Sequence, residues 1–156
     1  SGATVMWMAD PTSSEDLISP DMFKQFSMPY IGHIVKDINT LNSEVPTFVH
    51  ICGNTKDIMD VLPETGTDCL SFDHAVDPAL AKRTVGKRMS IMGNVDPVQV
   101  MMMGDPEKIK QECYKVIDCA GQEGGFILAP GCETPIKTSD ENILAMGEAA
   151  RSYWLR

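Results

Sequence analysis

One histidine and two cysteines have the types and positions that best fit catalytic chemistry in this chain. His50 and Cys52 stand two apart at the end of the apolar run PTFVHICG, and Cys132 ends another run, GGFILAPGC. Residues two apart on a strand point to the same side, so the His50 and Cys52 side chains can aim at one point. One histidine and two cysteine thiolates form a ligand set with which a catalytic zinc keeps its fourth position open.

Spacing alone leaves two other interpretations of these residues open. A cysteine is often a small buried hydrophobic residue, and a histidine near a strand end commonly bonds to a backbone carbonyl. A nucleophilic Cys–His pair, with Cys52 or Cys132 beside His50, is also conceivable. Two cysteines with one histidine favour a metal over that pair, but nothing in the spacing shows that Cys132 lies near the other two.

Five apolar runs, each followed by a stretch with helical features, indicate alternating strands and helices. The runs are ATVMWMADP, PTFVHICG, DCLSFDHAV, RMSIMGNVDP and GGFILAPGCE. No hairpin turn joins them, which predicts a parallel sheet covered by helices. Their continuous apolar character fits strands buried on both faces. The expected fold class is α/β.

Capping residues and apolar spacing place the helices. The first is expected to begin after Ser19, with Pro20 at its first position. Its apolar face, at three- and four-residue spacing, consists of Phe23, Phe26, Tyr30 and Ile34. A second helix is expected over roughly 56–64, stopped by Gly66. The others begin at Asp77-Pro78 (ending near Gly86), at Asp105-Pro106 (reaching about Ala120) and at about 140–154, after a capping box of Thr138 and Glu141.

Parallel strands carry their chemistry in the loops at their C-terminal ends. The polar residues in those loops are Asp10, His50, Cys52, Asp73, His74, Asn94, Asp96 and Cys132. Asp73 is the catalytic candidate, because its carboxylate can fill an open metal position or accept a hydrogen bond from a ligand histidine. His74 either contacts a substrate or holds its own loop. The remaining cysteines, Cys69, Cys113 and Cys119, are assigned to the core.

Composition narrows the function classes. A chain of 156 residues, 43% hydrophobic and 22% charged, fits one globular domain. The formal net charge of -9 argues against a nucleic-acid partner. We see no apolar run long enough for a membrane helix, no secretion signal and no glycine-rich nucleotide motif, and we expect a cytoplasmic protein. Five scattered cysteines suggest free thiols or metal ligands rather than a disulfide framework.

Four stretches of the chain resemble the uroporphyrinogen decarboxylase superfamily. They are ADPTSSEDLISPDMFKQFSMPYIGHIV, HICGNT, MGNVDP and LAPGCETP. Within that superfamily they are most similar to the methylcobamide:coenzyme M methyltransferases of methanogenic archaea, of the methylamine-pathway type. Those enzymes carry a zinc motif H-x-C with a further cysteine far downstream, which falls here on His50, Cys52 and Cys132. The decarboxylases proper lack this trio.

The resemblance implies methyl transfer from a methylated corrinoid (a methylcobamide) to the thiol of coenzyme M, with Zn²⁺ as the metal. A separate carrier protein would present the corrinoid at the same rim. Asp73 would act in catalysis, and we assign cofactor contacts to Asp10, His74 and Asn94. Two alternatives are a decarboxylase-like protein without zinc and a non-catalytic zinc-binding half-domain.

The resemblance also implies that this chain is the C-terminal part of a (β/α)₈ barrel. Five β-α units match the last five of eight, so we expect residues 1–156 to form a single partial-barrel domain. An open half-barrel exposes two sheet edges, which invite pairing. We therefore expect a homodimer or another closure of the sheet.

Overall fold

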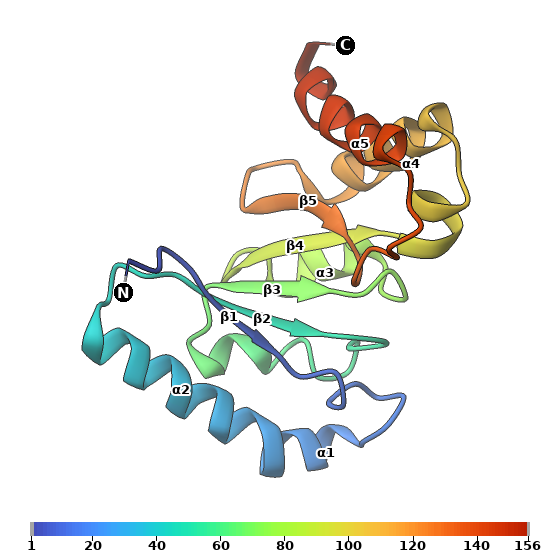
Figure 1. The fold of residues 1–156 in the computed structure, drawn as a ribbon. Helices are drawn as coiled ribbons and strands as arrows, with labels where there is room; N and C mark the ends of the chain where they lie inside the picture. Colours follow the sequence, from blue (N-terminus) through green and yellow to red (C-terminus); the bar gives the residue numbers. More distant parts are fainter. Residues whose placement is uncertain (1, 156) are drawn as a thin grey trace.

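The computed structural model describes residues 2–155, and its central feature is one sheet of five parallel strands. The strands follow each other in space in the order of the sequence (Figure 1), each pairing only with its chain neighbours among the five. They are β1 Met6–Ala9, β2 Thr47–Ile51, β3 Cys69–Phe72, β4 Ser90–Val95 and β5 Phe126–Pro130. The structure thus confirms the α/β fold class and the five parallel units.

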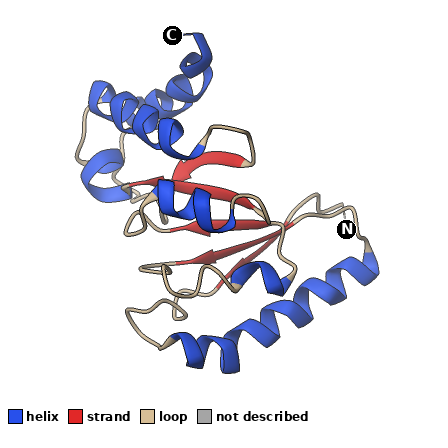
Figure 2. Ribbon diagram, turned by 180° about the vertical axis from the view of Figure 1, so that it is seen from behind, coloured by secondary structure: helices blue, strands red, loops and turns tan. Residues whose placement is uncertain are grey.

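Helices connect the strands and cover one side of the sheet, as the view from behind shows (Figure 2). The α-helices are α1 Pro20–Met22, α2 Met28–Leu41, α3 Pro78–Val85, α4 Pro106–Ala120 and α5 Asp140–Ser152. Shorter turns of other helix types are η1 Phe23–Ser27, η2 Leu62–Thr65, η3 Pro97–Met102 and η4 Tyr153–Leu155. Within residues 2–155, no helix has the length and apolar character that crossing a membrane requires.

The hydrophobic core lies between the sheet and this helical layer. Val49 and Ile51 of β2 and Ile91 of β4 are fully buried there, packed in one cluster with Phe23 and Val35 from the first helical segment. The alternate residues of β2 lie on the other side of the sheet. Because side chains alternate along a strand, Val49 and Ile51 pack against the helices, while His50 lies on the opposite face of the sheet, outside this core.

The apolar face expected for the first helix is wrong for three of its four residues. Phe23 is fully buried, but Phe26, Tyr30 and Ile34 are 58%, 66% and 47% exposed. The segment Phe23–Ser27 is a π-helix, which holds more residues per turn than an α-helix and so shifts the phase of the residues that follow. The buried positions beyond this shift are Ile31 and Val35.

Two other helix predictions need correction. Instead of an α-helix over 56–64, residues 56–61 form turns followed by the 3₁₀ turn η2, because Pro63 has no N–H for an α-helical bond. Gly66, with a positive φ of 77°, ends this turn as expected. The last helix is capped by Ser139, not Thr138, since the Ser139 hydroxyl accepts the bond from the Asn142 N–H.

The sheet is curved so strongly that its two edge strands face one hollow. Trp7 and Ala9 of β1 line the same pocket as Ala129 and Pro130 of β5, although three strands separate the two edges. This curvature is that of a barrel cut open along its length. It brings the C-terminal ends of non-neighbouring strands within reach of one another.

Candidate metal centre

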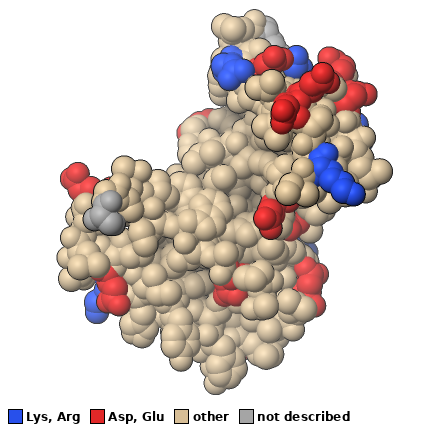
Figure 3. Space-filling view, in the orientation of Figure 1, with Lys and Arg blue, Asp and Glu red and all other residues tan. Residues whose placement is uncertain are grey.

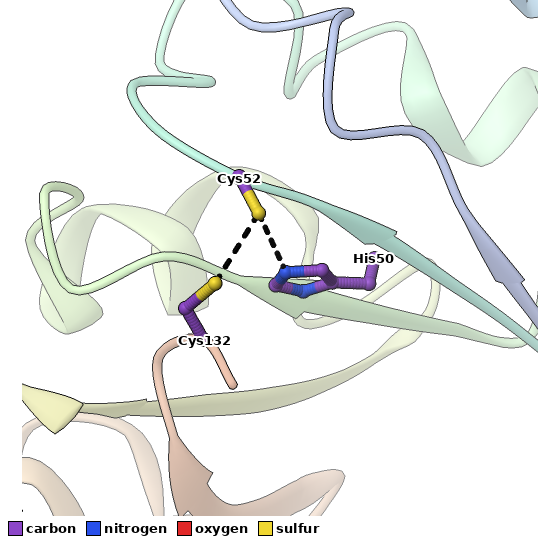
Figure 4. A group of neighbouring side chains, drawn as sticks. All are labelled: His50, Cys52 and Cys132. Atoms are coloured by element: carbon purple, nitrogen blue, oxygen red, sulfur yellow. Dashed lines mark hydrogen bonds between the residues drawn. The ribbon is translucent and has the colours of Figure 1, made fainter. Parts of the chain in front are cut away.

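His50, Cys52 and Cys132 point toward one another at the C-terminal ends of the strands (Figure 4). The Cys52 Sγ lies 3.1 Å from His50 Nε2 and 3.3 Å from Cys132 Sγ. All three ligand atoms lie within 4.8 Å of one another, and no other such group of His, Cys, Asp or Glu occurs among residues 2–155. Cys132 is 80 residues from Cys52 along the chain, and the curvature of the sheet brings the two side chains together.

These distances fit a metal held by one nitrogen and two sulfurs. Tetrahedral zinc with Zn–S bonds of about 2.3 Å separates two thiolate sulfurs by roughly 3.8 Å. The two sulfurs of the trio are about half an ångström closer than that, a difference that small side-chain rotations can supply. Carboxylates are absent from this group among the described residues, so its donor set is the soft one that suits zinc rather than magnesium or calcium.

The environment keeps the Cys52 thiol protonated when no cation is near. Burial is the main cause that raises its pKa to about 11, and the hydrogen bond and charge of Cys132 and the charge of Asp73 act in the same direction. A thiol with such a pKa is a poor nucleophile at neutral pH. A divalent cation between the sulfurs reverses this, because a coordinating thiol loses its proton.

The His50 ring is held from the neighbouring strand. Its Nδ1 lies 3.0 Å from the Ser71 hydroxyl oxygen and 3.2 Å from the Ser71 carbonyl oxygen. Trp7 of β1 is stacked beside the ring, with centroids 6.3 Å apart and planes inclined by 25°. The other ring nitrogen, Nε2, therefore faces the cysteines.

A network from the loop after β1 fixes the loop that carries Cys52. The Asp16 carboxylate accepts the Asn54 N–H at 2.8 Å, and the Glu15 N–H donates to the Asn54 carbonyl. Gly53, which lies between Cys52 and Asn54 in the sequence, has a φ of +78°. A Cβ built there would meet the Asp16 carboxylate oxygen at 2.2 Å and displace that side chain, and L side chains rarely adopt this φ, so the turn favours glycine.

A second glycine sets the position of Cys132. Gly131 donates its N–H to the Val95 carbonyl, and a Cβ on it would lie 2.4 Å from the backbone nitrogen of His74. The loop after β5 is thus in backbone contact with the loop after β3. Each cysteine of the trio therefore adjoins a glycine at which a larger residue would disturb the neighbouring loop.

Asp73, His74, Asn94 and Asp96 form a neighbouring cluster, not part of the trio. Asp73 Oδ1 accepts the Ala75 N–H at 2.9 Å and lies 2.8 Å from His74 Nδ1, while His74 Nε2 is 3.7 Å from Asp96 Oδ2. Asn94 is buried and donates to the carbonyls of Asp73 and Val76. The cluster therefore orders the loop after β3 and sets Asp73 near enough to raise the pKa of Cys52.

Asp10 lies apart from both groups. It accepts hydrogen bonds from Ser13, Ser27 and Thr12, which join the end of β1 to the start of the first helical segment. It lines a hollow of about 470 Å³ with Phe26 and Tyr30, on the outer side of β1. In this structure its contacts order the loop, and its predicted role as a cofactor contact stays a prediction.

The trio lines an open, mainly apolar pocket of about 440 Å³, with Trp7 and Met92 among its walls. Among the described residues that line it there is no lysine or arginine. In the view of Figure 3 the middle of this face carries few charged side chains, while Asp and Glu gather toward the region of α4 and α5. The pocket suits a ligand with a large uncharged surface.

The other cysteines are unsuited to this site. Cys69 and Cys113 are buried, and burial raises the pKa of each to about 12. Cys119 lies on the exposed side of α4, so its assignment to the core is wrong. Four further residues that support the site were not among those predicted from the sequence: Ser71, Trp7, Gly53 and Gly131. Only the glycines carried a signal, since each adjoins a candidate ligand.

With fold and site described, the chain can be placed among known proteins. The model of the uroporphyrinogen decarboxylase (URO-D) family matches residues 1–153. The chain belongs to this family, which confirms the resemblance seen in the sequence.

The relatives that the chain matches include methyltransferases as well as decarboxylases. The chain is 34% identical over 152 residues to "Methylcobamide:CoM methyltransferase MtbA" of Methanosarcina acetivorans, covering 97% of this chain and 43% of that protein. It is 30% identical over 150 residues to the uroporphyrinogen decarboxylase of Hordeum vulgare, covering 96% of this chain and 44% of that one.

A solved structure shows the same arrangement. A methyltransferase from Methanosarcina mazei matches with a TM-score of 0.86 at 31% identity, over 98% of this chain and 43% of the other. The chain thus spans less than half the length of the relatives it matches.

We expect oxidation to link Cys52 and Cys132 in the metal-free chain. Their sulfurs are 3.3 Å apart, and a disulfide needs about 2.05 Å, a short movement for two half-buried side chains. At alkaline pH, where the Cys52 thiol with its pKa of about 11 begins to ionise, hydrogen peroxide would convert the two thiols to one disulfide with release of two waters. Peptide mapping by mass spectrometry should find this pair as the main product.

The matched controls for this cross-link are single cysteine variants. Cys132→Ser should abolish the product, whereas Cys119→Ser, which removes an exposed thiol on α4, should leave it unchanged. A main product joining any other pair of cysteines would contradict the geometry of the trio.

Substituting the flanking glycines should displace the ligands. Gly131→Ala places a methyl group 2.4 Å from the His74 nitrogen, and Gly53→Ala adds strain of about 1–2 kcal/mol from its positive φ. We expect each to weaken binding of a Co²⁺ probe, followed by its thiolate absorption, at least about tenfold. Gly147→Ala is the control, since its nearest atom would be Arg151 Nη1 at 3.6 Å. Equal affinity in all three variants would refute the packing argument.

Proposed function

We propose that this chain is the C-terminal part of a zinc-dependent methyltransferase that moves a methyl group from a methylated corrinoid to the thiol of coenzyme M. The observation that carries the proposal is the convergence of His50, Cys52 and Cys132 at one point of the rim. This soft donor set occurs in a chain 34% identical to a protein named for that reaction.

The trio provides what activation of a substrate thiol requires. Three protein ligands leave one position of a tetrahedral metal open. Zinc bound here would supply a Lewis acid that takes the incoming thiol as its thiolate, the nucleophilic form. Two cysteine thiolates and a neutral histidine already balance the charge of a divalent cation.

The residues around the trio would orient the reactants and exclude water. The apolar walls, Trp7 and Met92 among them, suit the flat face of a corrin ring carrying the methyl group. Asp73 stands close enough to influence Cys52, and we propose that its carboxylate occupies the open position at rest or accepts the thiol proton. We keep Asp10, His74 and Asn94 as candidate contacts of the corrinoid, which a carrier protein would present at this rim.

Further β-α units would complete the barrel. Among the described strands, β1 and β5 are the unpaired edges of the sheet, and exposed apolar side chains lie at both. They are Met6, Phe26, Tyr30 and Ile34 at β1 and Ile127 at β5. Three more units would bring the five strands to the eight of a closed barrel. We assign to that part the cation that the sulfonate of coenzyme M needs. Failing this, a second copy of the chain would cover the edges.

Two rival proposals lead to different observations. A decarboxylase-like protein, as the 30% identical plant relative suggests, would need no zinc. A non-catalytic half-domain would bind zinc without turnover. Metal content separates the first rival from our proposal, and activity of the completed barrel separates the second. A cytoplasmic location stays a prediction of the sequence.

Metal analysis of the purified chain tests the trio directly. We expect about one zinc per chain after dialysis against a weak chelator, because three ligands converge without rearrangement. Cys52→Ala and Cys132→Ala should each lose it. Cys113→Ala and Cys119→Ala should keep it, since neither residue belongs to the trio. Full zinc in all four variants, measured by elemental analysis, would remove the basis of the proposal.

Activity is best tested in a completed barrel. The 152 matched residues of this chain can replace the corresponding 43% of the Methanosarcina acetivorans relative. With methylcobalamin and coenzyme M, this chimera should consume the thiol, and Cys52→Ala should slow the reaction at least about a hundredfold. A folded, zinc-loaded chimera without turnover would support the non-catalytic alternative.

A further inference from the structure

We propose that Ser71 is a positioning residue that holds the His50 ring so that Nε2 faces the metal position. The statement about metal rests on the proposed function, but the ring orientation is a property of the metal-free chain. The metal-ligand motif of His50, Cys52 and Cys132 does not include Ser71. Its role follows from the register of two strands and from hydrogen-bond chemistry.

Sheet register places Ser71 beside the ligand. In the parallel pair of β2 and β3, His50 is the direct partner of Ser71. Register partners in a sheet point to the same face, so both side chains lie on the face that lines the pocket. Ser71 is 3% exposed and sits inside a fully buried strand, so its hydroxyl and carbonyl are fixed by the sheet itself.

The carbonyl of Ser71 determines which ring nitrogen carries the proton. A carbonyl oxygen only accepts hydrogen bonds. His50 Nδ1 lies 3.2 Å from this carbonyl oxygen, and that bond exists only if Nδ1 carries the proton. The Ser71 hydroxyl, 3.0 Å from Nδ1, can then accept from the same N–H. In a neutral imidazole the lone pair then belongs to Nε2, the atom 3.1 Å from the Cys52 sulfur.

Other neighbours limit the ring but do not choose its tautomer. Trp7 stacks alongside it and offers a π face that restricts rotation. Cys52 is a weak partner that can act as donor or acceptor. Among the described residues, only Ser71 contacts Nδ1 through hydrogen-bonding oxygens. A metal-bound histidine commonly depends on such a bond from its other nitrogen, and losing it typically weakens metal binding 10- to 100-fold.

The first test is the tautomer of His50 in the metal-free chain. The protein has three histidines, so long-range ¹H–¹⁵N correlations give a simple spectrum, and His50→Gln identifies its signals. At about pH 8.5, the single ring proton of His50 should be on Nδ1. A proton mainly on Nε2 overturns the proposal, whatever any variant does.

The second test compares metal affinity in matched variants. Ser71→Ala removes the hydroxyl but keeps the carbonyl, so we expect Zn²⁺ to bind about tenfold more weakly in competition with a chromophoric chelator. Because the carbonyl remains, metal-free Ser71→Ala should keep the proton on Nδ1, and only the metal affinity should fall. Ser71→Thr, which restores a hydroxyl, should recover most of the affinity. Ser90→Ala, at the start of β4 and outside the pocket, should change neither readout.

The outcomes separate this inference from the proposed function. An unchanged metal affinity in folded Ser71→Ala would overturn the positioning role, even if the enzyme proves to be a methyltransferase. Conversely, a chain that shows the Nδ1–H tautomer but transfers no methyl group would keep the positioning of His50 and refute only the function. Should Ser71→Ala fail to fold, the tautomer of the unmodified chain still decides.

Discussion

The curvature of the parallel sheet is the constraint on which the site depends. Hydrogen bonding keeps all five strands parallel, so their C-terminal ends meet at one rim. Twist and tilt then bend the sheet until the ends of β2 and β5 approach each other. A flat sheet of the same strands would hold Cys132 three strand spacings, roughly 14 Å, from Cys52, too far for any shared ligand.

Contacts between loops, made possible by glycines, fix the positions of the two cysteines at this rim. The loop after β1 holds the loop after β2 through Asp16, and the loop after β5 rests against the backbone of His74. The site is thus built from strand ends, which are rigid, and from short loops braced by their neighbours. Such support from outside the ligand set is what gives a metal centre a fixed geometry.

The sequence predicted most of the fold because strands and caps are local signals. Runs of apolar residues and Asp-Pro starts depend on a few neighbouring positions, and they located the five strands and three helices. The phase of the first helix failed because a π-helix has no simple sequence marker. His50 and Cys52 could be paired by spacing, whereas Ser71 required the register between β2 and β3, a non-local property. Whether the trio binds zinc is still a prediction of its chemistry.

The contact between Cys52 and Cys132 also has a mechanical consequence. It connects the C-terminal ends of β2 and β5, which are not neighbours in the sheet, across the pocket. A metal ion that coordinates both sulfurs would therefore favour one curvature of the sheet. Conversely, a change that moves β2 and β5 apart would weaken binding of that ion. By thermodynamic linkage, the metal affinity of the trio and the curvature of the sheet would then be coupled. A partner that binds the open edges and changes the curvature would also change the metal affinity.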